Sequence, residues 1–221
     1  MKLRTWAGGI VLAGALVCVT TQVFSQDKPA KDKPAKQEPT AKEQPKAQMP
    51  PDVEEAMKKW AELATPGDAH KRLDPLAGSW DTTTRMFMGG PEGPATESKG
   101  TAEKRWMLGH RYLQEEAKSE LMGQPFEGLG YVGYDNGKNM YTFAWMDSMG
   151  TQMSTGSGSA DPAGQVIRFF GQSDEPTLKV YGRTVKYVLR IIDNDKHVFE
   201  IYDLHAGDNF KVIEVTYTRR K

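Results

Sequence analysis

The chain has 221 residues, 38% of them hydrophobic, with 29 basic and 29 acidic side chains and a formal net charge of zero. This length and apolar content suit a single domain with its own core. From residue 66 onward there are 19 Lys and Arg against 21 Asp and Glu, a net charge of −2, and the two signs are interspersed. Because no basic stripe is present, the sequence excludes nucleic acid as an expected partner.

The first 25 residues have the layout of a secretory signal peptide. Lys2 and Arg4 supply positive charge, an apolar run follows from Ala7 to Val19, and Val23-Phe24-Ser25 offers a cleavage site. The run is shorter than the roughly 20 apolar residues that span a bilayer, which disfavours the alternative, a membrane anchor. We therefore predict a periplasmic or secreted protein, cleaved near Ser25, without an integral membrane span in its mature form. The only cysteine, Cys18, would leave with the signal peptide, so the mature chain is expected to have no thiol chemistry.

Residues 26–51 have the composition of a disordered spacer. They contain six prolines, six lysines and four acidic residues, and Met49 is their only large apolar side chain. Such a segment cannot bury enough apolar surface to offset the entropy of ordering, and its prolines keep it semi-extended. We interpret it as a tether, with a specific proline-rich ligand motif as the alternative.

Residues 52–76 are predicted to be an N-terminal helical segment. Asp52 with Glu55 fits a capping box, Pro66-Gly67 ends the first helix, and a short second helix is expected from Asp68 to Leu76. The narrow apolar stripe of the first helix is expected to pack on its own domain, with a membrane-surface or partner role as the alternative. Its members recur at helical spacing: Val53, Ala56, Met57, Trp60, Leu63 and Ala64.

Residues 77–221 have the pattern of an antiparallel all-β domain. Apolar residues alternate with polar ones, turn signals separate the runs, and Asp135-Asn136-Gly137 is the strongest hairpin signal. No long helix follows any strand, which disfavours a parallel sheet. The spacing predicts a sandwich or a barrel, here a barrel of about eight to ten strands, because closure removes exposed edges. The ten clearest runs are Ser79–Met88, Thr101–Leu108, Arg111–Leu121, Phe126–Tyr134, Met140–Asp147, Gln152–Ser159, Val166–Gly171, Arg183–Ile192, His197–Asp203 and Phe210–Arg219.

Two motifs that suggest cofactors lack the context that those cofactors need. Residues 128–133 match the dinucleotide-binding GxGxxG pattern, but a hairpin turn follows them instead of a helix. Glycine at alternate positions indicates a strand that backbone or a large side chain approaches closely. His205 lies near Asp203 and Asp208, and a polar turn explains these three residues as well as a cation site does. We predict neither a cofactor nor a metal.

The two ends of the β region carry a pair of residues expected to touch. Gly78-Ser79-Trp80 opens the first strand and Tyr217-Thr218-Arg219 closes the last. This resembles the lipocalin-like pattern, in which the tryptophan of Gly-x-Trp packs under an arginine of the final strand. We therefore predict a structural contact between Trp80 and Arg219, with the guanidinium over the indole face.

Longer sequence blocks resemble a known family. They are His70, Leu73, Leu76-Ala77-Gly78-x-Trp80, Gly123-x-Pro125-Phe126-x-Gly128, Gly133-Tyr134-Asp135-Asn136, Trp145-x-Asp147-Ser148-Met149 and Tyr217-x-Arg219. Together they look like the bacterial domain of unknown function 1579 family, over about residues 54–221. The resemblance implies a lipocalin-like barrel whose biochemical role is unassigned.

One strand carries the candidate site. Tyr141, Phe143 and Trp145 share a face that Asp147 continues, and Ser148 follows at the strand end. We predict that the aromatic residues form the wall of a pocket for a small apolar or amphipathic ligand, with Asp147 and Ser148 as its polar groups.

Two alternative hypotheses to ligand binding remain. The first is a filled barrel that acts as a structural or interaction module, and the second, less favoured, is an enzyme that uses Asp147 as acid or base. A buried Asp147 would need a partner, such as Arg111, Tyr112 or a ligand. No catalytic residue is assigned. Methionines near the strand ends, Met146, Met149 and Met153, would suit a pocket mouth.

Overall fold

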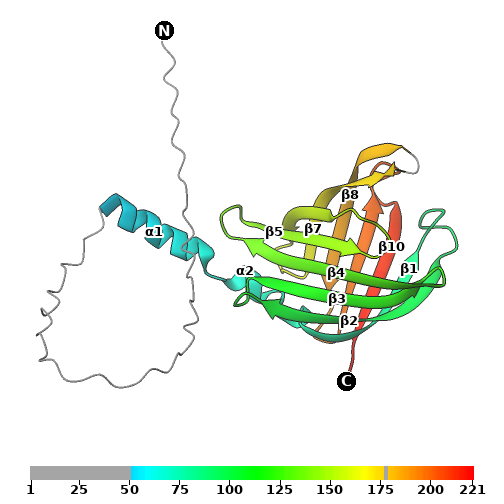
Figure 1. Cartoon of the computed structure of the whole chain (residues 1–221), viewed down its shortest axis with the longest axis horizontal. Coiled ribbons are helices and arrows are strands. Elements are labelled where there is room, and N and C mark those ends of the chain that lie inside the picture. Colours follow the sequence, from blue (N-terminus) through cyan, green and yellow to red (C-terminus); the bar gives the residue numbers. More distant parts are fainter. Residues whose placement is uncertain (1–50, 177–178) are drawn as a thin grey trace, which may run out of the picture. The chain divides into compact units, whose positions relative to one another are not determined.

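Ten antiparallel strands close into a barrel in the computed structural model, which describes residues 51–176 and 179–221 (Figure 1). Each strand pairs with its neighbours in sequence, and the first strand pairs with the last. The predicted all-β barrel is therefore confirmed. The predicted signal peptide and all of the spacer except Pro51 lie outside the described residues. The strands are β1 (Gly78–Met86), β2 (Thr96–Met107), β3 (Tyr112–Leu121), β4 (Gln124–Asp135), β5 (Met140–Asp147), β6 (Ser154–Ala160), β7 (Val166–Glu175), β8 (Val180–Ile191), β9 (Lys196–Asp203) and β10 (Lys211–Arg219).

The strands begin and end close to the predicted bounds, with two exceptions. β2 begins at Thr96 instead of Thr101, and β7 continues to Glu175 instead of Gly171. Both extensions consist mostly of polar residues without apolar alternation, so hydrophobic periodicity misses them. Backbone pairing with the neighbouring strand forms them: residues 96–100 pair with residues 82–86 of β1.

Helix α1 (Pro51–Ala64) begins one residue before the predicted start, so Asp52 lies inside its first turn and does not cap it. It buries none of its side chains, and Trp60 is 65% exposed. The expectation that its apolar stripe packs on the domain is therefore wrong. Its contact with the barrel is at the C-terminal end, where the Asn136 side-chain amide donates to the carbonyl oxygens of Leu63 and Thr65, both at 2.8 Å.

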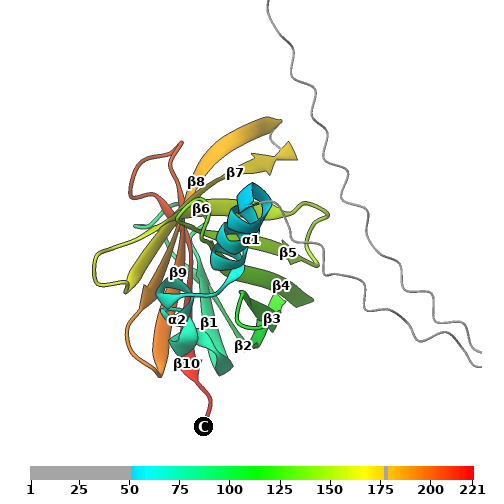
Figure 2. The ribbon, with the colours of Figure 1, turned by 90° about the vertical axis from the view of Figure 1, so that its left-hand side faces the viewer.

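A short plug closes one end of the barrel. It consists of α2 (Asp68–Lys71) and the 3₁₀ turn η1 (Asp74–Leu76), which replace the single helix predicted from Asp68 to Leu76 (Figure 2). Pro75 lies inside η1, and a proline lacks the N–H that a continuous helix needs. Leu73 and Leu76 are buried, so the plug inserts apolar side chains into the barrel end.

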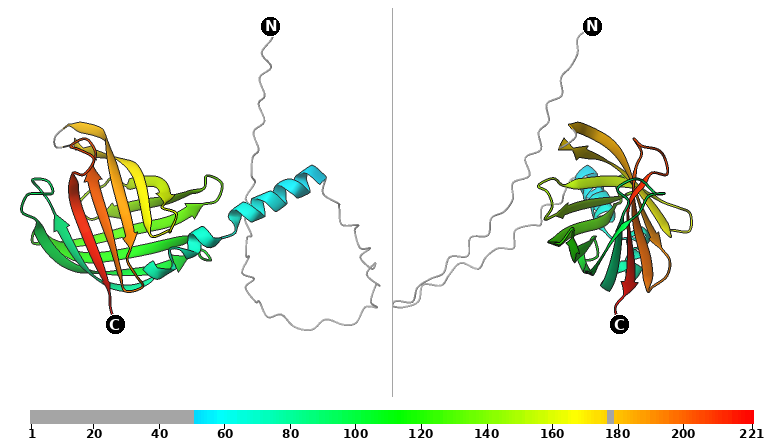
Figure 3. Two further views of the ribbon diagram at one scale, coloured as in Figure 1. Left: turned by 180° about the vertical axis from the view of Figure 1, so that it is seen from behind. Right: turned by 90° about the vertical axis from the view of Figure 1, so that its right-hand side faces the viewer.

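The closing pair of strands fixes the plug. Trp80 of β1 is the register partner of Arg219 of β10. Figure 3 shows the C-terminal strands β8 to β10 from behind. The Arg219 guanidinium carbon lies 4.2 Å from the Trp80 ring centroid, the contact that the sequence pattern predicts. Its Nη1 and Nη2 donate to the carbonyl oxygens of Ala77 and Pro75 at 2.9 and 2.7 Å, and the Trp80 indole donates to Leu76 at 2.9 Å.

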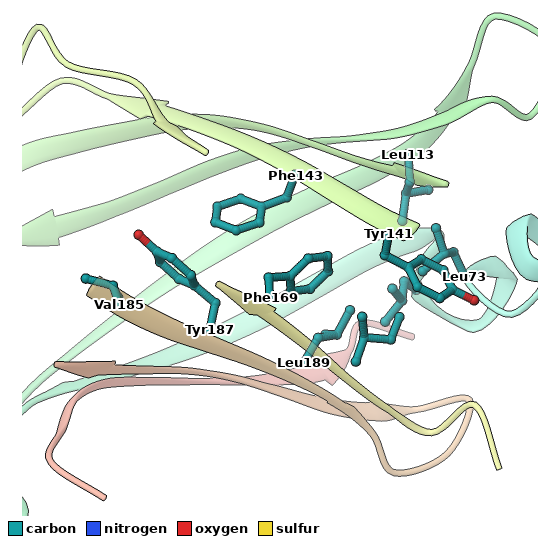
Figure 4. Packing of buried hydrophobic residues seen from close by; sticks show 10 residues of the cluster. Leu73, Leu113, Tyr141, Phe143, Phe169, Val185, Tyr187 and Leu189 are labelled. Atoms are coloured by element: carbon teal, nitrogen blue, oxygen red, sulfur yellow. The ribbon is translucent and has the colours of Figure 1, made fainter. Parts of the chain in front are cut away.

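The core packs against the plug and along one side of the barrel. Phe143 meets Phe169 and Tyr187 edge to face, with ring centroids 5.2 and 4.6 Å apart, between β5, β7 and β8 (Figure 4). Leu73 of the plug and Leu189 of β8 belong to the same cluster. Such packing stabilises this wall of the barrel.

A candidate ligand cavity inside the barrel

A cavity of about 580 Å³ lies inside the barrel. It extends from Leu76 of the plug toward the other end, where Met86, Leu121 and Asp147 close their strands. Small inward residues create the space, and aromatic residues lie beside them as well as across from them. The small residues are Thr82, Thr84, Ser98, Ala117, Ser119 and Ser154, and the aromatic ones are Phe126, Phe143, Trp145, Tyr187, Phe199 and Tyr217.

The Trp145 indole lies flat against β4 because β4 has glycine at the facing positions. Gly130 is its register partner, and a Cβ added at Gly130 would lie 2.7 Å from Trp145 Cε3. Gly128 likewise has no room for a side chain beside the indole. The GxGxxG match is thus a platform for a large aromatic side chain, as the strand context predicts.

Asp147 holds this tryptophan in place. Its Oδ2 accepts from Trp145 Nε1 at 2.9 Å, and its Oδ1 accepts from the Met149 backbone N–H at 3.0 Å. Asp147 lines the cavity. The prediction of Arg111 or Tyr112 as its partner is wrong, because its own strand and turn supply both donors. The carboxylate therefore orients the cavity wall and caps the turn at the same time.

Two predicted site residues do not line the cavity. Tyr141 is buried at the plugged end, where its hydroxyl donates to the Ala69 carbonyl at 2.9 Å. Ser148 is exposed, and its Oγ accepts from the Glu127 backbone N–H at 3.1 Å, which closes the end of the β4–β5 pair. Phe143, Trp145 and Asp147 are the predicted residues that the structure brings together around the cavity.

The open end of the cavity has charged and apolar groups. Arg183 pairs with Asp203, and Glu175 and Met149 also line this end. Asp203 further accepts the His205 backbone N–H at 3.0 Å, which fits a polar turn. Within residues 51–176 and 179–221, His, Cys, Asp and Glu side chains form no group of three that would hold a metal ion.

A polar cluster forms the floor of the cavity. The Lys104 ammonium lies 2.9 Å from His197 Nε2, 3.1 Å from Glu115 Oε2 and 3.8 Å from the Tyr217 ring centroid. The Tyr217 hydroxyl donates to Glu115 Oε1 at 2.9 Å. His197 stacks on Tyr217 at 4.2 Å and meets the Trp80 indole edge to face at 4.3 Å. The cluster therefore links the cavity to the plugged end.

The cluster fixes the protonation of His197. Since an ammonium only donates, His197 Nε2 accepts from Lys104, and the proton of the neutral ring is on Nδ1. Burial is the main cause that lowers the pKa of His197 far below its usual value, and the Lys104 and Arg219 cations add to it. Burial likewise lowers the pKa of Lys104, against the attraction of Glu115, and raises the pKa of Tyr217. His197 is thus a neutral acceptor for Lys104.

Comparison with protein families identifies the chain. The model of the family described as "Protein of unknown function (DUF1579)" matches residues 65–219, which is most of the chain. The protein belongs to the DUF1579 family. No curated protein matches this DUF1579 chain.

Solved structures similar to the DUF1579 chain include Rv2717c from M. tuberculosis, at 16% identity and a TM-score of 0.47, covering 71% of this chain and 100% of that one. Two designed proteins are also similar. A redesigned β-barrel has 14% identity, a TM-score of 0.37 and coverage of 68% and 96%. The redesigned barrel mFAP0, bound to DFHBI, has 13% identity, a TM-score of 0.34 and coverage of 66% and 99%.

Sequence reasoning missed the polar floor of the DUF1579 barrel, although two signals pointed to it. Glu103, Lys104 and Arg105 are consecutive in a strand, so period two places at least one charge inside. Glu115 and Glu116 are adjacent in β3, so one of the two carboxylates must likewise point into the barrel. Neighbouring charges on two adjacent strands therefore indicate inward charges of opposite sign that pair inside the barrel, as Lys104 and Glu115 do.

Neutral His197 makes the stability of the DUF1579 barrel sensitive to acid. Below the pKa of about 6.5 that a histidine has in the unfolded chain, His197 binds a proton in the unfolded chain but not in the folded one. The free energy of unfolding therefore falls as the pH falls. From pH 7.5 to pH 5.0, we expect wild type to lose about 2 kcal/mol more than His197→Gln. Urea unfolding at both pH values measures this difference. The exposed control His205→Gln should behave as wild type, and equal losses in wild type and His197→Gln would contradict a buried neutral ring.

Proposed function

We propose that this protein is an exported binding protein that holds one small apolar or amphipathic ligand inside its barrel. The observation that carries the proposal is the cavity of about 580 Å³, which is in the range of about 300–1,000 Å³ usual for small-molecule sites. Most of its exposed lining is apolar, and charged side chains gather at its floor and at its open end. Export rests on the signal-peptide layout of residues 1–25.

The residues that line the cavity favour binding over a filled barrel or an enzyme. The core packs against the plug, and beside it Thr82, Thr84 and Ala117 leave space that larger side chains at the same positions would occupy. Both oxygens of Asp147 accept hydrogen bonds from its own segment, which gives the carboxylate an orienting role. Trp145 presents a fixed aromatic surface to a bound molecule.

A neutral apolar dye tests this proposal. We expect N-phenyl-1-naphthylamine to bind wild type at one site with a blue-shifted, enhanced emission. Ala117→Phe adds a ring inside the cavity and should weaken the dye at least about tenfold. Glu116→Phe adds the same ring on the outer face of β3 and should bind as wild type, with circular dichroism confirming that both variants fold. Equal dye affinity in the two variants, or no binding by wild type, would refute the proposal.

A further inference from the structure

The hydrogen bonds on the cavity floor restrict the polar group that a ligand can bring there. Lys104 has three N–H donors, and three acceptors surround them: His197 Nε2, Glu115 Oε2 and the face of the Tyr217 ring. The Tyr217 hydroxyl donates to Glu115 Oε1. The Lys104 and Tyr217 donors of the floor are therefore already engaged.

Acceptor capacity remains on the same floor. An ionised carboxylate accepts about four hydrogen bonds, and Glu115 receives one from Lys104 and one from Tyr217. Glu115 lines the cavity and its side chain is 16% exposed, so a ligand in the cavity can reach it. The floor thus offers an acceptor and requires a donor.

The charges of the floor exclude ionic head groups. A carboxylate brought to the floor would lie against the Glu115 carboxylate, and repulsion between like charges is strong in a site with little water. An ammonium would lie close to Lys104, whose nitrogen is 3.1 Å from the same carboxylate. Burying either ion also costs its hydration. A neutral donor avoids all three costs.

On the basis of the proposed binding function, we infer that the ligand is a neutral amphiphile with an apolar body and a hydroxyl that donates to Glu115. The hydroxyl points inward, toward the polar floor. The apolar body lies against Trp145 and Phe143, and its other end is at the open end of the barrel.

Three ligands with one chain and different head groups test the inference. Isothermal titration calorimetry at pH 7 of the mature chain with decan-1-ol, decanoate and decylamine compares a neutral donor, an anion and a cation. We expect decan-1-ol to bind at least about tenfold more tightly than either ionic ligand. Equal affinities, or tighter binding of an ionic ligand, overturn the inference and leave the proposed function intact. No binding of any of the three, together with no dye binding, overturns the proposed function itself.

Glu115→Gln and its neighbour Glu116→Gln identify the residue that causes the preference. In Glu115→Gln the anion is gone and Lys104 loses its carboxylate partner, so decanoate should gain at least about tenfold and become the preferred ligand. Glu116 faces outward and pairs with Arg105, so Glu116→Gln should keep the preference for decan-1-ol. Circular dichroism verifies folding of both variants. An unchanged preference in folded Glu115→Gln overturns the assignment of Glu115.

Discussion

Trp80→Ala is expected to lower the free energy of unfolding by about 3–5 kcal/mol, the range typical of a buried large aromatic residue. The indole is 0% exposed, and it touches the barrel closure and the plug at the same time. Its removal leaves a void beside His197 and takes away the surface on which Arg219 lies. Both the closing pair of strands and the plug should therefore loosen.

Urea unfolding of the mature chain measures this loss, with Trp60→Ala as the matched control. Trp60 is on the exposed face of α1, so its removal should change the free energy of unfolding by no more than about 0.5 kcal/mol. Arg219→Ala should also destabilise, because it removes the bonds to Ala77 and Pro75, whereas Arg220→Ala breaks only a surface pair with Glu103. A Trp80→Ala variant as stable as Trp60→Ala would contradict the proposed closure.

Lys104→Met is the second change expected to have a large effect, a loss of about 3–5 kcal/mol. Lys104 is buried, and without it the Glu115 carboxylate keeps Tyr217 as a donor but has no cation beside it in the barrel. Lys118→Met, on the same barrel wall, breaks the exposed pair with Glu127 and should cost at most about 1 kcal/mol.

The double variant Lys104→Met/Glu115→Leu separates a buried charge pair from simple loss of packing. When both charges are absent, neither is left unpaired, so most of the stability lost in Lys104→Met should return. Urea unfolding of wild type, both single variants and the double variant gives the coupling energy. Additive losses in this cycle would show that the two side chains do not depend on each other.

The barrel was predictable from sequence because its strands follow one simple rule. Inward residues such as Val185, Tyr187 and Leu189 alternate with outward ones, and turn residues separate the strands. The rule failed where a strand lacks apolar residues, as at Thr96, because backbone pairing alone then forms the strand. The prediction of a single second helix also failed. Pro75 lies in the 3₁₀ turn that replaces the end of this helix, and it lacks the N–H that a continuous helix needs.

The site was predictable only in part, because a strand pattern gives faces and not depths. The face of Tyr141, Phe143 and Trp145 was correct as a face, yet Tyr141 lies beside the plug and outside the cavity lining. Position along the barrel depends on where the plug ends, and local sequence does not encode that. The partners of Lys104 come from β3, β9 and β10, and such long-range proximity follows only from the closed topology.

Native mass spectrometry of the mature chain with decan-1-ol tests the central claim most directly. We expect one added ligand mass per chain for wild type, saturating at one to one, and a clearly smaller liganded fraction for Ala117→Phe at the same sub-saturating decan-1-ol, because its new ring takes up part of the cavity. A wild-type chain that stays unliganded at saturating decan-1-ol, or an Ala117→Phe chain with the same liganded fraction as wild type at sub-saturating decan-1-ol, would contradict a ligand held inside the barrel.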